Sequence, residues 1–233
     1  MFYQVAMHMR LLLLLIILCF HNASAQSKEY PVLAGEIPDK VLPYEAKYVL
    51  PAFTKGTAFL RDGSSSTYLF NYNFLLDEMH FVSASGDTLA IADPLLLSSV
   101  VIDSLVFYYD KSYMRVLLQI ENYKLALKQE MVQIADKTRG GYDVPSAVSA
   151  IKTYSSISNG NSSIFHLQVQ KDVLFRGERS YYITDASNHF LPAIKKNFYA
   201  LFEKKGIQIY FKQHKVNFHN EADLEALMRF CLQ

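Results

Sequence analysis

The sequence predicts a mainly β protein of the α+β class, in which an antiparallel meander curls towards a half-barrel and two C-terminal helices pack on it. Three observations support this fold. Apolar and polar residues alternate with a period of two between residues 54 and 134, turn-forming residues interrupt the alternation, and amphipathic segments follow residue 190. The 16 Tyr and 16 Phe among 233 residues also favour strands.

The first 25 residues have the features of a secretory signal peptide. A polar stretch ends at Arg10, an unbroken apolar run covers residues 11–20, and small residues precede a cleavage point after Ala25. We expect export to the periplasm or the cell surface. The apolar run is about half the length of a membrane-spanning helix, so no transmembrane span is expected in the mature chain. Leu18 stands where lipidation of Cys19 would require a small residue, which disfavours a lipoprotein.

Residues 26–53 are expected to form an extended lead-in, because four of the seven prolines lie there and proline interrupts helices. The remaining residues, 54–233, are expected to form a single β-rich domain. A run of Ser, Asn and Gly near residues 155–163 has too little apolar content to order itself and predicts a flexible loop.

Turn signals divide residues 54–134 into strands. The clearest predicted hairpin joins residues 114–120 to residues 123–131, and we expect it in the middle of the sheet. One face of the hairpin is expected to be apolar, and the charged residues Lys124, Lys128 and Glu130 are expected on the other face. The apolar face comprises Met114, Val116, Leu118 and Ile120 in the first strand and Tyr123, Leu125, Leu127 and Met131 in the second. The turn signals are Arg61–Ser64, Ser85–Asp87, Asp93–Pro94, Asp110–Lys111 and Glu121–Asn122.

The C-terminal part predicts two further strands and then two helices separated by a strand. Arg176–Arg179 is expected to be a turn between strands at residues 164–175 and 180–184. Pro192 suits the start of the first helix, and Gly206 suits a left-handed residue at its end. A strand is expected at residues 207–212, followed by a helix capped by Asn220. The expected buried face of that helix comprises Leu224, Leu227, Met228, Cys231 and Leu232.

Four short patches resemble a group of uncharacterised exported proteins of Bacteroidota. They are Gly56–Gly63, Phe70–Asn73, Gly86–Leu89 and Phe190–Asn197, the last placed ahead of a closing helix. The resemblance spans roughly residues 54–134 and 180–230. It implies a location in the cell envelope and implies no activity.

Charge and cysteine content restrict the partners of the mature chain. Loss of the signal peptide removes Arg10 and no acidic residue, which leaves 22 basic and 22 acidic side chains. Binding to nucleic acid needs a positive field, so no nucleic-acid partner is expected. Cys231 becomes the single cysteine, so the mature chain cannot form an internal disulfide and must be held by its apolar core.

Tyrosines on neighbouring predicted strands form the candidate ligand-binding site. Exposed rows of Tyr can stack on sugars or apolar ligands, although the same enrichment is expected from a sheet covered on both faces. The candidates are Tyr68, Tyr72, Tyr108, Tyr109 and Tyr113.

Histidines provide the competing hypothesis of a metal site or an enzyme. His214, His219 and Glu221 supply nitrogen and oxygen ligands, but they cross a junction into a helix where capping already explains the acidic residues. His80 beside Glu78 and Asp77 could form an acid–base pair, but their place at a turn into a strand favours a solvated turn as the explanation.

The sequence contains no nucleophile elbow, no phosphate-binding glycine loop and no paired-cysteine zinc spacing. We therefore expect no cofactor, and an exported envelope-associated protein with a non-enzymatic binding or structural role. Its partner would be an envelope protein or a small ligand. The alternative is an enzyme or metal-binding protein with a site of dispersed residues around His214, His219 and Glu221.

Overall fold

The computed structural model describes residues 28–134, 168–202 and 206–233. The expected signal peptide, Cys19 and the loop expected at 155–163 lie outside these residues. Among the described residues, none of the helices has the length and apolar character needed to span a membrane.

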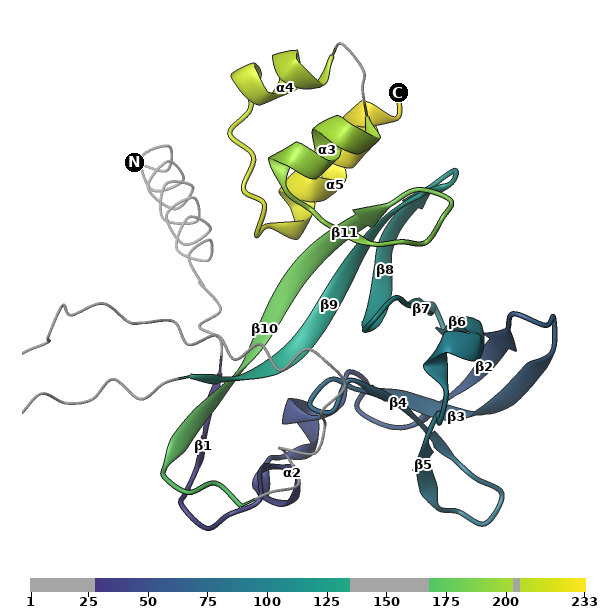
Figure 1. The fold of residues 1–233 in the computed structure, drawn as a ribbon, viewed down its shortest axis with the longest axis vertical. Helices are drawn as coiled ribbons and strands as arrows, with labels where there is room; N and C mark the ends of the chain where they lie inside the picture. The colour runs from purple at the N-terminus through teal and green to yellow at the C-terminus, as the bar shows by residue number, and fades with distance from the viewer. Residues whose placement is uncertain (1–27, 135–167, 203–205) are drawn as a thin grey trace, which may run out of the picture.

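The chain is mainly β, as predicted, and its strands form one large open antiparallel sheet (Figure 1). The strand order is β1-β10-β9-β8-β7-β6-β2-β3-β4-β5, with β11 beside β10. The strands are β1 (Glu29–Val32), β2 (Thr54–Leu60), β3 (Ser65–Asn73), β4 (Glu78–Val82), β5 (Thr88–Ala90), β6 (Leu97–Ile102), β7 (Leu105–Tyr109), β8 (Tyr113–Ile120), β9 (Tyr123–Ile134), β10 (Val173–Thr184) and β11 (Leu191–Pro192).

The sheet curls so that strands far apart in the strand order meet across its inner face. The Tyr72 hydroxyl oxygen of β3 lies 3.3 Å from the Gln129 carbonyl oxygen of β9. Asp77, in the β3–β4 connection, accepts from the backbone N–H of Tyr113 at the start of β8 over 3.2 Å. These contacts produce the expected curvature.

The strand order is a meander with two exceptions, β1 beside β10 and β6 beside β2. After β5 the chain passes through the short 3₁₀ helix η3 (Pro94–Leu96) and returns to the free side of β2, where it forms β6. Two meanders, β2–β5 and β6–β10, therefore join along the β2–β6 pair. This return places η3 over the β2–β3 part of the sheet.

The turn signals predicted within residues 54–134 all fall between strands, and the hairpin of β8 and β9 has strands on both sides. Gly63, Gly86, Lys111 and Glu121 have the positive φ that such turns require. One face assignment was wrong. The register shifts between Val116 and Leu118, so Val116 pairs with Ala126 whereas Leu118 pairs with Leu125, which lies on the opposite face. The extra residue of a bulge reverses the alternation beyond it.

The expected turn at Arg176–Arg179 was also wrong, because β10 continues through it. Gly177 pairs with Met131, and the register with β9 is unbroken from Leu174 to Thr184. Arg176 and Glu178 lie on one face and form an ion pair of 3.0 Å. Residues 176–179 are therefore the middle of a strand, and their charged side chains lie on both of its faces where the strand is partly exposed.

Three helices, rather than two, follow the sheet: α3 (Lys195–Leu201), α4 (Ile207–Gln213) and α5 (Glu221–Cys231). The strand expected at residues 207–212 is α4, in which Ile207, Tyr210 and Phe211 contact the helical core while Ile209 is 55% exposed. The apolar residues that face the core are three and four positions apart, which is the spacing of a helix rather than of a strand. Gly206 is right-handed and precedes α4, and Pro192 lies in β11. The Asn220 cap and the buried Leu224, Leu227, Met228 and Cys231 are confirmed, whereas Leu232 is only partly buried.

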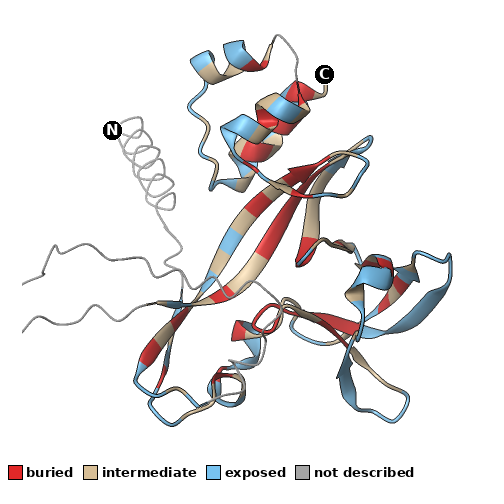
Figure 2. Ribbon diagram, in the orientation of Figure 1, coloured by how far each residue is buried: buried red, intermediate tan, exposed pale blue. Residues whose placement is uncertain are grey.

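The core has two main apolar clusters, which lie at opposite ends of the long strands β9 and β10 (Figure 2). The first lies inside the curled sheet and includes Phe70, Tyr72, Phe107 and Phe175. The second lies between the sheet and the helices, where Phe198, Leu224 and Leu227 are fully buried. Both strands carry buried residues at each end.

The lead-in contains regular structure, and its strand β1 forms one edge of the sheet. It includes β1, which pairs with β10, the single turn α2 (Pro38–Val41) and the 3₁₀ turn η2 (Tyr44–Ala46). The fully buried side chain of Asn71 fixes its last part: the amide accepts from Leu50 N over 3.0 Å and donates to Leu50 O over 2.9 Å. An amide that satisfies backbone groups in this way holds an irregular segment in place.

Candidate ligand-binding groove

The five candidate tyrosines occupy three different environments. Tyr72, Tyr109 and Tyr113 meet inside the curled sheet, with ring centroids 5.5 Å apart for Tyr72–Tyr113 and 5.0 Å for Tyr109–Tyr113, and Tyr72 and Tyr113 are only 2% exposed. Tyr108 packs near Phe190 on the opposite face of the sheet. Tyr68 is 42% exposed on β3. The structure thus brings three of them together in the core and leaves Tyr68 at the surface.

Tyr68 lines an apolar groove of about 280 Å³. The groove lies on the inner face of β2, β3 and β4, and the segment from Ile91 to Leu97, which contains η3, forms its other wall. Its lining consists of Ala58, Leu60, Ser66, Tyr68, Phe70, Phe81, Ile91, Ala92, Asp93, Leu96 and Leu97.

Local sequence features explain how the groove forms. The register places Ala58 of β2 opposite Ser66 of β3, so two small side chains lie next to each other in the floor of the groove. Asp93 accepts from Leu95 N over 3.0 Å and caps η3. Arg61 then fixes η3 against the end of β2, because its Nε donates to Leu95 O and its backbone N–H donates to Leu96 O, each over 2.9 Å.

The groove offers an apolar ligand contact area and few polar partners. Tyr68, Phe70 and Phe81 form an aromatic group, with ring centroids 5.0 Å apart for Tyr68–Phe81 and 6.1 Å for Phe70–Phe81. Asp93 uses its carboxylate in the η3 cap. The volume lies just below the roughly 300–1,000 Å³ of typical small-molecule pockets and is about twice that of an apolar cavity that holds benzene.

Leu96 and Tyr68 leave the groove accessible, since they are 55% and 42% exposed. Sequence reasoning found Tyr68 and missed the rest of the lining. The run of three leucines after Asp93–Pro94 could have indicated the groove. A capped turn with three consecutive apolar side chains is unusual for a connection that is exposed to solvent.

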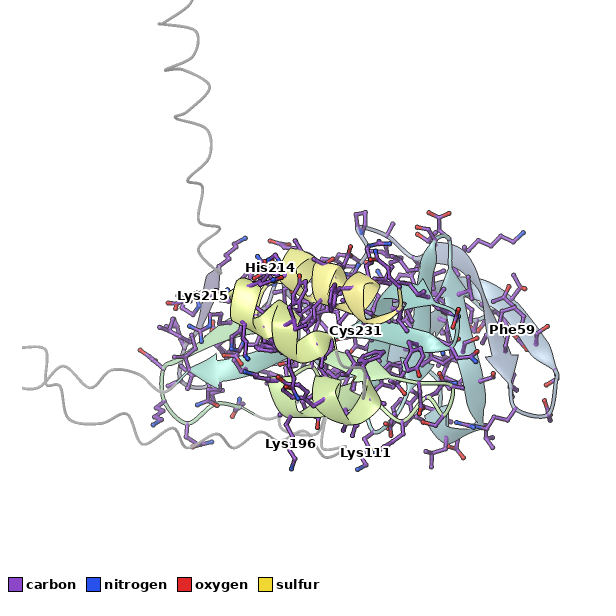
Figure 3. The ribbon with its side chains drawn as sticks, turned by 90° about the horizontal axis from the view of Figure 1, so that it is seen from above. Phe59, Lys111, Lys196, His214, Lys215 and Cys231 are labelled. Carbon is purple, nitrogen blue, oxygen red and sulfur yellow. The ribbon has the colours of Figure 1, made fainter. Side chains whose placement is uncertain are left out.

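The structure does not assemble the histidine candidates. His214 ends α4 and packs on Tyr210 with ring centroids 4.3 Å apart, while the nearest ion-pair partner of Glu221 is Arg179 at 4.0 Å. His214 lies at the edge of the helical layer, far from Phe59 on the β2–β3 hairpin (Figure 3). Across residues 28–134, 168–202 and 206–233, no group of three His, Cys, Asp or Glu side chains could hold a metal ion. The metal-site hypothesis gains no support there.

His80 and Glu78 do form a pair, within strand β4 rather than at a turn. The His80 Nε2 atom lies 2.9 Å from Glu78 Oε2, and its Nδ1 atom lies 2.9 Å from the Tyr48 hydroxyl of the lead-in. Burial raises the pKa of Tyr48, so the phenol stays neutral at physiological pH. Both ring nitrogens are occupied, and the arrangement ties the lead-in to β4.

Asp77 occupies a separate buried position, where it holds the β3–β4 connection against β8. Its carboxylate accepts from the Tyr72 hydroxyl over 2.8 Å and from Tyr113 N over 3.2 Å, and its backbone has a φ of 55°. Burial raises the pKa of Asp77, and these hydrogen bonds only partly oppose the shift. The folded chain therefore binds the Asp77 proton more tightly than the unfolded chain does.

We expect Asp77→Asn to keep or increase the free energy of unfolding at pH 7 and Asp77→Ala to lower it by about 1–3 kcal/mol, because alanine leaves the Tyr113 N–H without this acceptor and removes the shorter of the two contacts of the Tyr72 hydroxyl. Because the pKa of Asp77 is raised in the folded chain, its carboxyl stabilises the fold fully only below the unfolded pKa of about 3.9. That contribution to the free energy of unfolding is lost as the pH rises through the folded pKa. The advantage of Asp77→Asn over the wild type should therefore shrink towards acid pH. Urea unfolding at several pH values measures this. A wild type that outperforms Asp77→Asn by the same amount at every pH would contradict it.

Comparisons of the chain with protein-family models, with curated proteins and with solved structures found no match.

Proposed function

We propose that this chain is an exported, non-enzymatic binding protein of the cell envelope, which holds a small apolar group of its ligand in the groove beside Tyr68. The signal-peptide features of residues 1–25 and the resemblance to exported Bacteroidota proteins support the location. The observation that carries the binding role is the groove itself. It is an accessible aromatic and aliphatic concavity whose one charged lining residue, Asp93, caps η3.

The floor of the groove favours a small apolar group over a peptide segment. Strand β2 pairs with β3 and β6, β3 pairs with β2 and β4, and β4 pairs with β3 and β5. The sheet therefore already uses the backbone donors and acceptors of these strands. Peptides that bind along strands depend on free backbone groups, which this floor does not offer.

Two neighbouring leucines of η3 provide a matched test. Leu96 lines the groove, whereas Leu95 is 67% exposed and does not. We expect saturable binding of the neutral fluorophore N-phenyl-1-naphthylamine to the wild type. Leu96→Asp should weaken binding by about tenfold or more, because a carboxylate in the groove must lose water when the probe enters. Leu95→Asp should bind like the wild type. A fluorescence titration measures the three affinities.

A second pair, on β3, separates the groove from general surface hydrophobicity. Tyr68 and Leu69 are exposed to similar extents but lie on opposite faces of the strand. Tyr68→Ala should weaken probe binding, and Leu69→Ala should leave it unchanged. Equal effects within either pair, or no saturable binding to the wild type, would refute the proposed function.

A further inference from the structure

A polar strip lies between the two apolar clusters on the inner face of β8, β9 and β10. In the register, Arg115 of β8 is opposite Leu127 of β9, and Arg179 of β10 is opposite Gln129 of β9. Leu127 and Gln129 are two residues apart, so they lie on the same face of β9. The two arginines therefore lie on that face as well, one on each side of β9.

The two arginines are unequally paired. The Nη2 atom of Arg179 lies 4.0 Å from Glu221 Oε2 at the start of α5. The Nε atom of Arg115 is buried without a hydrogen-bond partner, and no ion pair involves this side chain in the described part of the chain. By contrast, Arg61 donates to a carbonyl, and Arg176 and Arg229 lie beside carboxylates.

The surroundings of Arg115 leave positive charge uncompensated. Burial lowers the pKa of Arg115, the neighbouring charge of Arg179 lowers it further, and Glu221 opposes both effects. Two guanidinium groups thus share one carboxylate. A charge removed from water normally has a partner of opposite sign, because its desolvation is costly otherwise.

We propose that Arg115 and Arg179 bind a small oxyanion, the carboxylate or phosphate group of a ligand, on the inner face of β8–β10. The planar fork of a guanidinium matches two oxygens of either group. Gln129, which lies between the arginines in the register, adds an amide donor on the same face. Glu221 competes for Arg179 and therefore limits the affinity.

The test is isothermal titration calorimetry of the full chain with sodium phosphate and with sodium acetate, at an ionic strength held constant with sodium chloride. The wild type should bind one of these anions saturably, and the two titrations distinguish phosphate from carboxylate. Arg115→Met, which keeps most of the apolar stem, should weaken binding by about tenfold or more, because charge-assisted hydrogen bonds are lost. Glu221→Gln should tighten it about two- to fivefold.

Arg176→Met is the matched control, since Arg176 lies on the opposite face of β10 and pairs with Glu178. It should bind the anion like the wild type. Should Arg115→Met fail to fold, Arg115→Lys keeps the charge, loses the fork and should still bind more weakly. The proposal is overturned if neither anion binds the wild type saturably, or if Arg176→Met loses as much affinity as the Arg115 variant.

Discussion

Phe198→Ala should lower the free energy of unfolding by about 3–5 kcal/mol, which is the cost of removing a large aromatic side chain from a packed core. Phe198 is 0% exposed in α3, and its ring lies 5.8 Å from that of Phe202 and 6.2 Å from that of Phe218. The side chain therefore joins α3 to the segment before α5. A domain is stable by only about 5–15 kcal/mol in total, so this loss should be large enough to lower the melting temperature strongly.

The measurement is urea unfolding monitored by circular dichroism. Lys196→Ala is the control, because Lys196 is an exposed residue of the same helix and should leave stability unchanged. If Phe198→Ala unfolded at the same urea concentration as Lys196→Ala, the helices would not belong to the cooperative unit that contains the sheet.

Gly56→Ala should lower the free energy of unfolding by about 1–3 kcal/mol, because the added methyl group overpacks the sheet. A Cβ at Gly56 would lie 2.6 Å from the carbonyl oxygen of Val101 and 3.2 Å from the Cα of Ile102. Both atoms belong to the backbone of β6, so the β2–β6 pair would have to separate. The β2–β6 pair joins the two meanders. It also positions η3 at the groove, because the chain passes through η3 on its way back to β2.

Gly177→Ala provides the matched comparison, since Gly177 also lies within a strand but a Cβ added there would meet no atom within 4 Å. It should be neutral or slightly stabilising, because alanine restricts the unfolded chain. The two variants are compared by thermal unfolding, and probe binding to the groove should weaken only for Gly56→Ala. Similar melting temperatures for both variants would show that β2 and β6 are not packed as closely as the structure indicates.

Local patterns predicted those parts of the fold that depend on neighbouring residues. The turns at Gly63 and Gly86 and the Asn220 cap follow from residue type and spacing over a few positions. The bulge in β8 could not be predicted in this way, because it depends on which residues of β9 lie opposite. The same limit applies to β10, whose charged segment has the composition of a turn and is held as a strand by β9.

The binding groove was beyond sequence reasoning for a similar reason. Its walls come from β2–β4 and from the segment around η3, which meet only because β6 pairs with β2. Burial was equally hard to predict on the other face of the sheet. Lys124 faces away from Leu125 as expected, yet it is only 5% exposed, and its Nζ donates to Asn188 Oδ1 over 2.8 Å. A contact between residues so far apart in sequence leaves no local signal.

We expect the groove to hold a small apolar ligand in the exported protein. Native mass spectrometry of the wild type and of Leu96→Asp and Leu95→Asp, each purified from the envelope fraction of the cells that produce the protein, tests it most directly. We expect the mass of residues 26–233 for all three proteins. The wild type and Leu95→Asp should carry a small apolar adduct, and Leu96→Asp should lack it. An adduct retained equally by Leu96→Asp, or a wild type without any adduct, would contradict it.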